Sequence, residues 1–152
     1  MQTSAKVAEA KTLDDALASI VRHLEADTGT VHLLARDGLL HLAAATPGLP
    51  AAVLSIIRTI PVGKGMAGVA VERRRPVDAC NIQTDRSGDV RPGARATGLA
   101  GALVVPIFRN GDVVGALGVA NRGERAFSEA ETQDLIEAGR MLAKLAPAPT
   151  AA

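Results

Sequence analysis

Few side chains in this sequence are capable of covalent chemistry, and a single thiol is the first of them. Cys80 is the only cysteine in 152 residues, which excludes an internal disulfide and a cysteine-based metal cluster. A lone thiolate can attack an electrophile, but the sulfenic acid that forms needs a second thiol to become a disulfide. Cys80 also ends a short predicted strand, where a small, weakly polar side chain suits packing. We therefore expect no enzymatic activity from this thiol.

A glycine-rich segment is the second candidate for chemistry. Gly63, Gly65 and Gly68 lie at the start of a helical pattern, as the glycines of a phosphate-binding loop do. A P-loop, however, places its lysine and a Ser or Thr directly after the last glycine, whereas Lys64 lies between glycines. None of the serines has the sequence context of a hydrolase nucleophile. We predict that these glycines only give the backbone the freedom to enter a helix.

Two histidines flank a predicted hairpin. Asp37-Gly38 lies between two apolar runs and favours a tight turn, because both turn positions require a positive φ. A two-residue loop would pair Leu34 with His41, and His32 with Ala43. In that register both histidines lie on one face of the hairpin, as diagonal neighbours within reach of each other.

Charge and composition argue against nucleic-acid and membrane partners. The chain has 17 basic and 16 acidic side chains, and its only aromatic residues apart from histidine are Phe108 and Phe127. Base stacking needs aromatic platforms and phosphate contacts need clustered cations, whereas the run from Arg73 to Arg75 reads as a solvated helix end. Apolar runs are too short to span a bilayer, and residues 1–11 lack a signal-peptide core. We expect a cytoplasmic protein.

The elements that would position these residues follow from hydrophobic periodicity. Helical spacing predicts a first helix from about Leu13 to about Ala26, which Thr12 caps and Gly29 ends. Shorter helices are expected over 50–58 and 66–72, a strand over 76–80 and a polar loop over 81–94. Asn110-Gly111 marks a second hairpin, and a Ser128/Glu131 capping box begins the last helix, which ends before Pro147.

This order of elements predicts an α+β domain. An antiparallel sheet must be covered on at least one face, and the two terminal amphipathic helices are the natural cover. We divide the chain into a flexible segment over 1–11, one folded domain over 12–146 and a disordered tail over 147–152.

Five stretches in order resemble the GAF domain family. They are Ile60-Pro-Val-Gly-Lys-Gly-Met-Ala-Gly-Val-Ala, Arg75-Pro-Val-Asp-Ala-Cys-Asn, Leu103-Val-Val-Pro-Ile-Phe, Gly111-Asp-Val-Val-Gly-Ala-Leu-Gly-Val-Ala-Asn and Phe127-Ser-Glu-Ala-Glu. The resemblance implies a central antiparallel sheet of about six strands with the terminal helices packed on one face. Loops and short helices would enclose a ligand pocket on the other. A non-catalytic sensor of a small molecule in signal transduction is the function that it implies.

In family terms, the pocket would be lined by one short helix, the adjoining strand and the start of the following hairpin. The residues expected there are Met66, Val69, Ala70, Asp78, Cys80, Leu99 and Ala102. The loop from Asn81 to Thr97 would act as a lid, and Arg91 or Arg95 would pair with an acidic group of the ligand.

The resemblance leaves several ligands and roles to weigh. Cyclic-nucleotide binders carry an Asn-Lys pair, a Phe and an Asp-Glu pair, of which this chain keeps Asn121, Phe127 and Glu131 but has Arg122 and Thr132. The context of Cys80 does not resemble a bilin attachment site, and strand histidines more often pack than ligate haem. We therefore expect no cofactor and no metal.

Two alternatives to the sensor stay open. One is an interaction module that only dimerises and carries no ligand. In the sensor as in this module, we expect a homodimer in which the terminal helices pair with those of a second copy. The other is the sulfoxide-reducing branch of the family, for which a single cysteine is a poor fit. A sensor without an output domain would also signal through a separate protein.

Overall fold

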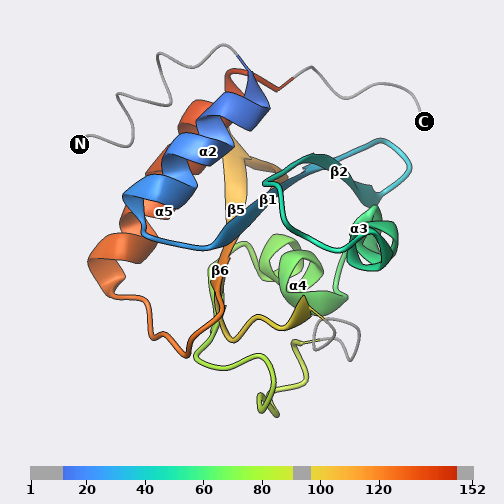
Figure 1. The fold of residues 1–152 in the computed structure, drawn as a ribbon. Coiled ribbons are helices and arrows are strands. Elements are labelled where there is room, and N and C mark those ends of the chain that lie inside the picture. Colours follow the sequence, from blue (N-terminus) through green and yellow to red (C-terminus); the bar gives the residue numbers. More distant parts are fainter. Residues whose placement is uncertain (1–11, 91–96, 147–152) are drawn as a thin grey trace.

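In the computed structural model, residues 12–90 and 97–146 are described, and they form an α+β domain (Figure 1). The helices are α2 (Leu13–His23), α3 (Ala51–Ile57), α4 (Gly65–Arg73) and α5 (Glu129–Ala143). The strands are β1 (Thr28–Leu34), β2 (Leu39–Ala45), β3 (Thr59–Pro61), β4 (Val77–Ala79), β5 (Gly101–Arg109) and β6 (Asp112–Asn121). The sheet is antiparallel with strand order β3-β2-β1-β6-β5-β4. The expected fold class is confirmed. The expectations for 1–11 and 147–152 lie outside the described residues.

Helices α2 and α5 cover one face of the sheet, as predicted (Figure 1). The main hydrophobic core lies between them and the strands, and its fully buried side chains include Leu17, Ile20, Leu117 and Leu135. The Thr12 hydroxyl accepts a hydrogen bond from the backbone N–H of Asp15, which confirms the predicted cap of α2. The capping box at the start of α5 is also confirmed, because both of its reciprocal hydrogen bonds are present.

The end of α2 differs from the prediction. The helix stops at His23, and Glu25 takes the left-handed conformation (φ 54°) that a C-terminal glycine usually supplies. Gly29 instead lies within β1, where an added Cβ would come within 2.7 Å of Val21 and 2.9 Å of Leu17. Gly29 therefore allows α2 to pack closely on the sheet and does not end the helix.

The β1–β2 hairpin has a different register from the one predicted. The backbone N–H of Ala35 donates to the carbonyl of Leu39 (3.0 Å), so the loop has three residues, and Gly38 takes a positive φ of 81°. The Asp37 carboxylate fixes this loop by accepting from the Leu39 N–H at 2.9 Å.

The consequence is that the two histidines lie on opposite faces of the sheet. His32 pairs with Leu42, and His41 pairs with Leu33, one residue away from the expected pairing. His32 is buried, whereas His41 is partly exposed and pairs with Asp37 at 2.8 Å. The prediction of neighbouring histidines is wrong, because it assumed a two-residue loop.

Helices α3 and α4 lie on the other side of the sheet (Figure 1). Gly63 and Gly65 have positive φ values of 90° and 66°, which confirms that they serve the entry into α4. Gly68 serves a close approach instead, since an added Cβ would lie 2.4 Å from the Pro61 carbonyl oxygen. None of the helices in the described ranges is long and apolar enough to cross a membrane.

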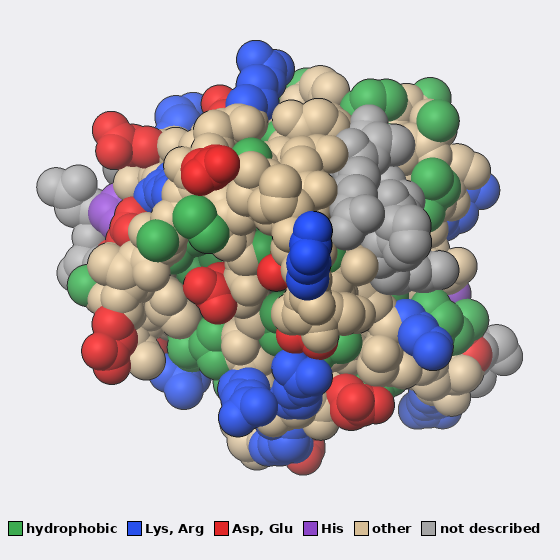
Figure 2. Space-filling view, turned by 90° about the horizontal axis from the view of Figure 1, so that it is seen from below, with side chains coloured by type: hydrophobic (Ala, Val, Ile, Leu, Met, Phe, Trp, Pro, Cys, Tyr) green, Lys and Arg blue, Asp and Glu red, His purple; other side chains and the backbone are tan. Residues whose placement is uncertain are grey.

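The arginine run ends α4 at the surface, as predicted. Arg73 forms a bidentate ion pair with Asp89, with N–O distances of 3.1 and 3.2 Å. Arg74 is the C-cap of α4 and takes the left-handed backbone conformation. Figure 2 shows basic and acidic side chains interspersed on the face seen from below. Arg73 thereby ties α4 to the loop that follows β4.

Candidate functional site: an apolar cavity between the sheet and two short helices

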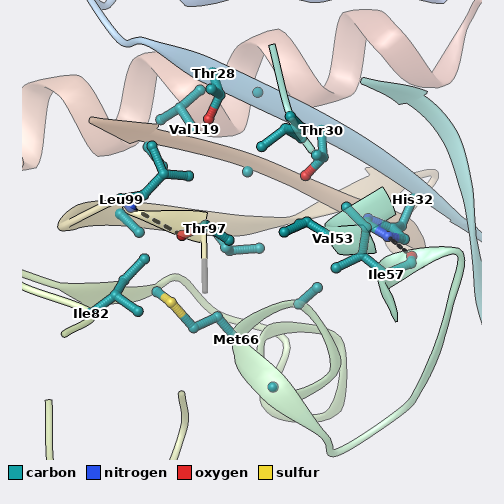
Figure 3. Close-up of a pocket in the computed structure, with 18 of the residues that line it drawn as sticks. Thr28, Thr30, His32, Val53, Ile57, Met66, Ile82, Thr97, Leu99 and Val119 are labelled. Carbon is teal, nitrogen blue, oxygen red and sulfur yellow. Dashed lines mark hydrogen bonds between the residues drawn. The ribbon is translucent and has the colours of Figure 1, made fainter. Parts of the chain in front are cut away.

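A cavity of about 300 Å³ lies between the sheet and the short helices α3 and α4 (Figure 3). Strands β1, β5 and β6 form one side of it, and α3, α4 and the segments around Ile82 and Leu99 form the other. Most of the lining side chains are apolar. Ligand-binding cavities in proteins usually have this size and this predominantly apolar lining.

The space exists because β6 has small residues on this face. Side chains alternate between the two faces of a strand. Leu117 and Val119 therefore contribute to the main core, whereas Gly118 and Ala120 leave space on the cavity side, where part of Val119 also lines the wall. Across the sheet, Ala102 of β5 pairs with Ala120 and faces the same way. Larger residues at these positions would fill the space.

The opposite wall is held in place by backbone hydrogen bonds. The Ile82 N–H donates to the Ala100 carbonyl at 2.7 Å, and the Gln83 side chain donates to the Leu99 carbonyl at 2.8 Å. Met66, in the first turn of α4, packs against the cluster of Ile82 and Leu99. The loop after β4 is therefore fastened to the start of β5 beside the cavity.

His32 is the only buried polar or charged side chain among the described residues, at 3% exposure. Its Nε2 lies 2.8 Å from the carbonyl oxygen of Ile57, the last residue of α3. Because a carbonyl only accepts, Nε2 carries the proton and donates. Burial lowers the pKa of His32, and the hydrogen bond to Ile57 opposes this shift only in part. A neutral imidazole therefore joins β1 to the end of α3.

We expect His32 to make the domain less stable as the pH falls. Its pKa is lower in the folded state than in the unfolded chain, so the unfolded chain binds more protons between the two values and stability rises with pH there. Stability should thus fall below about pH 6.5, with a slope of at most about 1.4 kcal/mol per pH unit. Urea unfolding of wild type and His32→Gln from pH 7.5 to 5 measures this. His23 and His41 remain in both proteins, so equal slopes would contradict the prediction.

Three of the predicted site residues line this cavity and four do not. Met66, Leu99 and Ala102 are part of its wall. Val69 and Ala70 are buried one turn further along α4, against Val77, and do not line the cavity. Asp78 and Cys80 are exposed and also lie outside the wall.

The remaining two predicted residues, Arg91 and Arg95, lie outside the described residues. Val90 and Thr97, which flank that segment, both line the cavity.

The prediction missed the contribution of β1. Thr28, Thr30 and His32 follow one another at every second position and line the cavity. The spacing of these three residues could have indicated that they line one surface together, because alternate residues of a strand share a face. The predicted two-residue loop gives the histidines the wrong register and does not indicate the two threonines.

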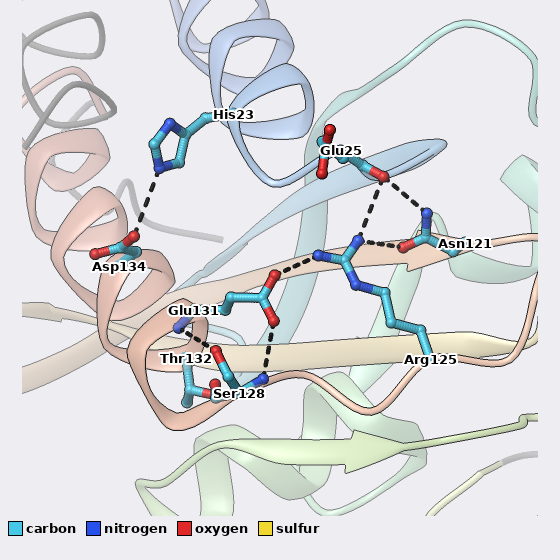
Figure 4. Close-up of polar contacts among 8 residues, drawn as sticks. All are labelled: His23, Glu25, Asn121, Arg125, Ser128, Glu131, Thr132 and Asp134. Carbon is cyan, nitrogen blue, oxygen red and sulfur yellow. Dashed lines mark hydrogen bonds and ion pairs between the residues drawn. The ribbon is translucent and has the colours of Figure 1, made fainter.

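Residues that cyclic-nucleotide binders share with this chain have structural roles here (Figure 4). Asn121 donates to the Glu25 carbonyl at 2.9 Å, and Arg125 contacts Asn121 at 2.8 Å and Glu131 at 2.5 Å. The Arg125 guanidinium also lies 4.2 Å from the centroid of the Phe127 ring. This network joins the ends of α2 and β6 to the start of α5. None of its members lines the cavity.

Within the described ranges, no three His, Cys, Asp or Glu residues are placed to hold a metal ion. The chemistry available in the described wall of the cavity is therefore apolar contact together with hydrogen bonding by Thr28, Thr30, Thr97 and His32.

Comparison with known proteins agrees with this geometry. A family model described as a GAF domain matches residues 7–139. The chain belongs to the GAF domain family. No curated protein matches it in sequence.

Solved structures show the same fold at low sequence identity. The GAF domain of a phosphoenolpyruvate-protein phosphotransferase from Acinetobacter is 21% identical with a TM-score of 0.74, covering 95% of this chain and 87% of that one. The corresponding domain (ptsP) from Coxiella burnetii is 24% identical with a TM-score of 0.74, covering 94% and 87%. Free methionine-R-sulfoxide reductase from Neisseria meningitidis, in complex with its substrate, is 22% identical with a TM-score of 0.74, covering 95% and 83%. The GAF domain of a phosphotransferase and a free methionine-R-sulfoxide reductase thus share this fold.

Proposed function

We propose that this GAF domain is a non-catalytic regulatory module that binds a small molecule between its sheet and helices α3 and α4. The cavity of about 300 Å³ is the observation that carries the proposal. Its apolar lining gives affinity through burial of the ligand's apolar surface, and its few polar groups give orientation. Signalling would then pass to a separate protein, in a cytoplasmic setting that suits a free, exposed thiol.

The link between His32 and Ile57 suggests how ligand occupancy is communicated. Val53 and Ile57 of α3 line the cavity. The carbonyl of Ile57, the last residue of α3, accepts a hydrogen bond from His32 on β1. A ligand that contacts both α3 and β1 would favour one position of the helix relative to the sheet. Such a ligand changes a conformational equilibrium only through its different affinity for the two positions.

The sulfoxide-reductase alternative has weaker support from the chain's own residues. The Neisseria protein acts on free methionine-R-sulfoxide, but Cys80 is exposed and is not part of the cavity wall. A nucleophile must reach the reacting atom of a bound substrate. Reduction of free methionine sulfoxide by the wild type and its loss in Cys80→Ser would favour the enzyme over the sensor.

The dimerisation alternative also has weaker support. The apolar stripes of α2 and α5 are largely used within the domain, where Leu17, Ile20, Leu135 and Leu142 are buried against the sheet. Analytical ultracentrifugation over a wide concentration range tests this alternative. A stable dimer in the absence of any ligand would favour the interaction module.

Thermal unfolding against a panel of compounds tests the proposal. The panel holds cyclic nucleotides, 2-oxo acids, amino acids, haem and small neutral aromatic compounds. A ligand at about 100 times its dissociation constant adds about 2.7 kcal/mol to the stability of the folded state. For a domain of this size the midpoint should rise by roughly 5–10 °C. A panel in which no compound raises the midpoint would count against the binding role.

A further inference from the structure

We propose that the cavity takes an uncharged molecule with one apolar side and one hydrogen-bonding edge, which Thr28, Thr30 and His32 on β1 recognise. The chemical class is a small neutral compound with a carboxamide or hydroxyl group. This inference rests on the proposed function and adds to it the class of ligand and the residues that select it.

The first argument is the lack of charge in the described part of the wall. Among the lining residues that the structure describes, none is Asp, Glu, Lys or Arg. Moving an ionised group from water into an apolar site without a partner is far more costly than moving an amide or hydroxyl. The described part of the wall therefore favours a neutral ligand over an anion of the same shape.

The second argument is the polar row on β1. Thr28, Thr30 and His32 lie opposite Ala120, Gly118 and Ala116 of β6. These neighbours are too small to cover the polar side chains. Figure 3 shows the Thr28 and Thr30 hydroxyls directed from the strand into the cavity, with Leu99 and Met66 across the space. The cavity is thus polar along β1 and mostly apolar on the opposite side, where Thr97 is a polar residue whose hydroxyl accepts from the Leu99 N–H.

The third argument is the unused hydrogen-bonding capacity of this row. Within the described part of the chain, the Thr28 and Thr30 hydroxyls form no hydrogen bond to another residue. Each can donate one hydrogen bond and accept two. Because the His32 Nε2–H is engaged by Ile57, its other ring nitrogen is an acceptor. A carboxamide has an acceptor oxygen and donor N–H groups, and so matches both kinds of group.

Two probes of equal shape test the inference: phenylacetamide, which is neutral, and phenylacetate, which is an anion at pH 7.5. Isothermal titration calorimetry should show that the amide binds at least tenfold more tightly. Toluene, followed by ligand-observed NMR, reports apolar binding alone. Tighter binding of phenylacetate would overturn the inference while leaving the proposed function intact. Loss of that binding in Arg95→Ala would then identify the partner of the anion.

A variant series tests the role of β1. Thr30→Val keeps the shape of the side chain and removes the hydroxyl, so the affinity for phenylacetamide should fall by about threefold to tenfold. The affinity for toluene should stay the same or increase. Thr59→Val is the matched control, since Thr59 is an exposed strand residue outside the cavity wall.

Three further outcomes are decisive. Equal loss of toluene and amide binding in Thr30→Val would indicate a general distortion of the cavity, and would overturn the specific role of the hydroxyl. Binding of toluene with no binding of the amide would overturn the polar edge and keep the cavity. Failure of all three probes to bind would count against this inference and the proposed function together.

Discussion

Replacing Ala102 by leucine is expected to weaken the binding of phenylacetamide strongly. Ala102 lines the cavity from β5 beside Ala120, so the larger side chain would occupy space that the ligand needs. An overpacked site costs about 1–3 kcal/mol, which corresponds to a loss of about fivefold to 150-fold in affinity. Isothermal titration calorimetry on the variant measures the loss.

The control for this experiment is Ala43→Leu, which makes the same change at an exposed position of β2. It should bind phenylacetamide as the wild type does. Both variants should unfold cooperatively in urea, so that loss of binding is not loss of the fold. Wild-type affinity in Ala102→Leu would mean that the probe binds outside the cavity.

Replacing Gly115 by valine should destabilise the domain by about 3 kcal/mol. Valine is a better strand former than glycine by up to about 1 kcal/mol, so propensity alone predicts the opposite sign. In the structure, however, a Cβ on Gly115 would lie 2.2 Å from the His32 carbonyl oxygen. β1 and β6 would have to move apart beside the cavity.

Urea unfolding of wild type and Gly115→Val measures the difference in the free energy of unfolding. In thermal unfolding, the midpoint of the variant should be lower by roughly 6–12 °C. Gly123→Val is the control, because an added Cβ at Gly123 has no described neighbour within 4 Å. Its stability should stay within about 0.5 kcal/mol of the wild type. A stable Gly115→Val variant would show that β1 and β6 approach each other less closely than described.

The fold could be predicted from the sequence because its signals are local and occur in order. The Ser128/Glu131 capping box, the Asn110-Gly111 turn and the glycines before α4 each act within a few residues, and each is present as expected. The β1–β2 register could not be predicted in the same way. It depends on whether Asp37 caps a three-residue loop or lies in a two-residue one, and both choices suit the same sequence.

The residues of the site were predicted only in part, because the sequence does not show how far the cavity extends along each helix and strand. It reaches the first turn of α4, where Met66 lies, but the second turn packs Val69 against Val77. On β4 the prediction chose the wrong face of the strand. The side chains of Val77 and Ala79 are buried, whereas the predicted residue Asp78 is exposed. Strand alternation gives two choices, and the sequence did not select between them.

The most direct test of the central claim uses the methionine methyl groups. The chain has three methionines. Met66 lines the cavity, and Met141 packs against the main core on the other side of the sheet. We would label the methionine methyl carbons and record NMR spectra during a titration with phenylacetamide. A saturable shift of the Met66 resonance with Met141 unchanged is the result we predict. A Met66 resonance that does not respond while another methionine shifts would place the ligand elsewhere and contradict the account.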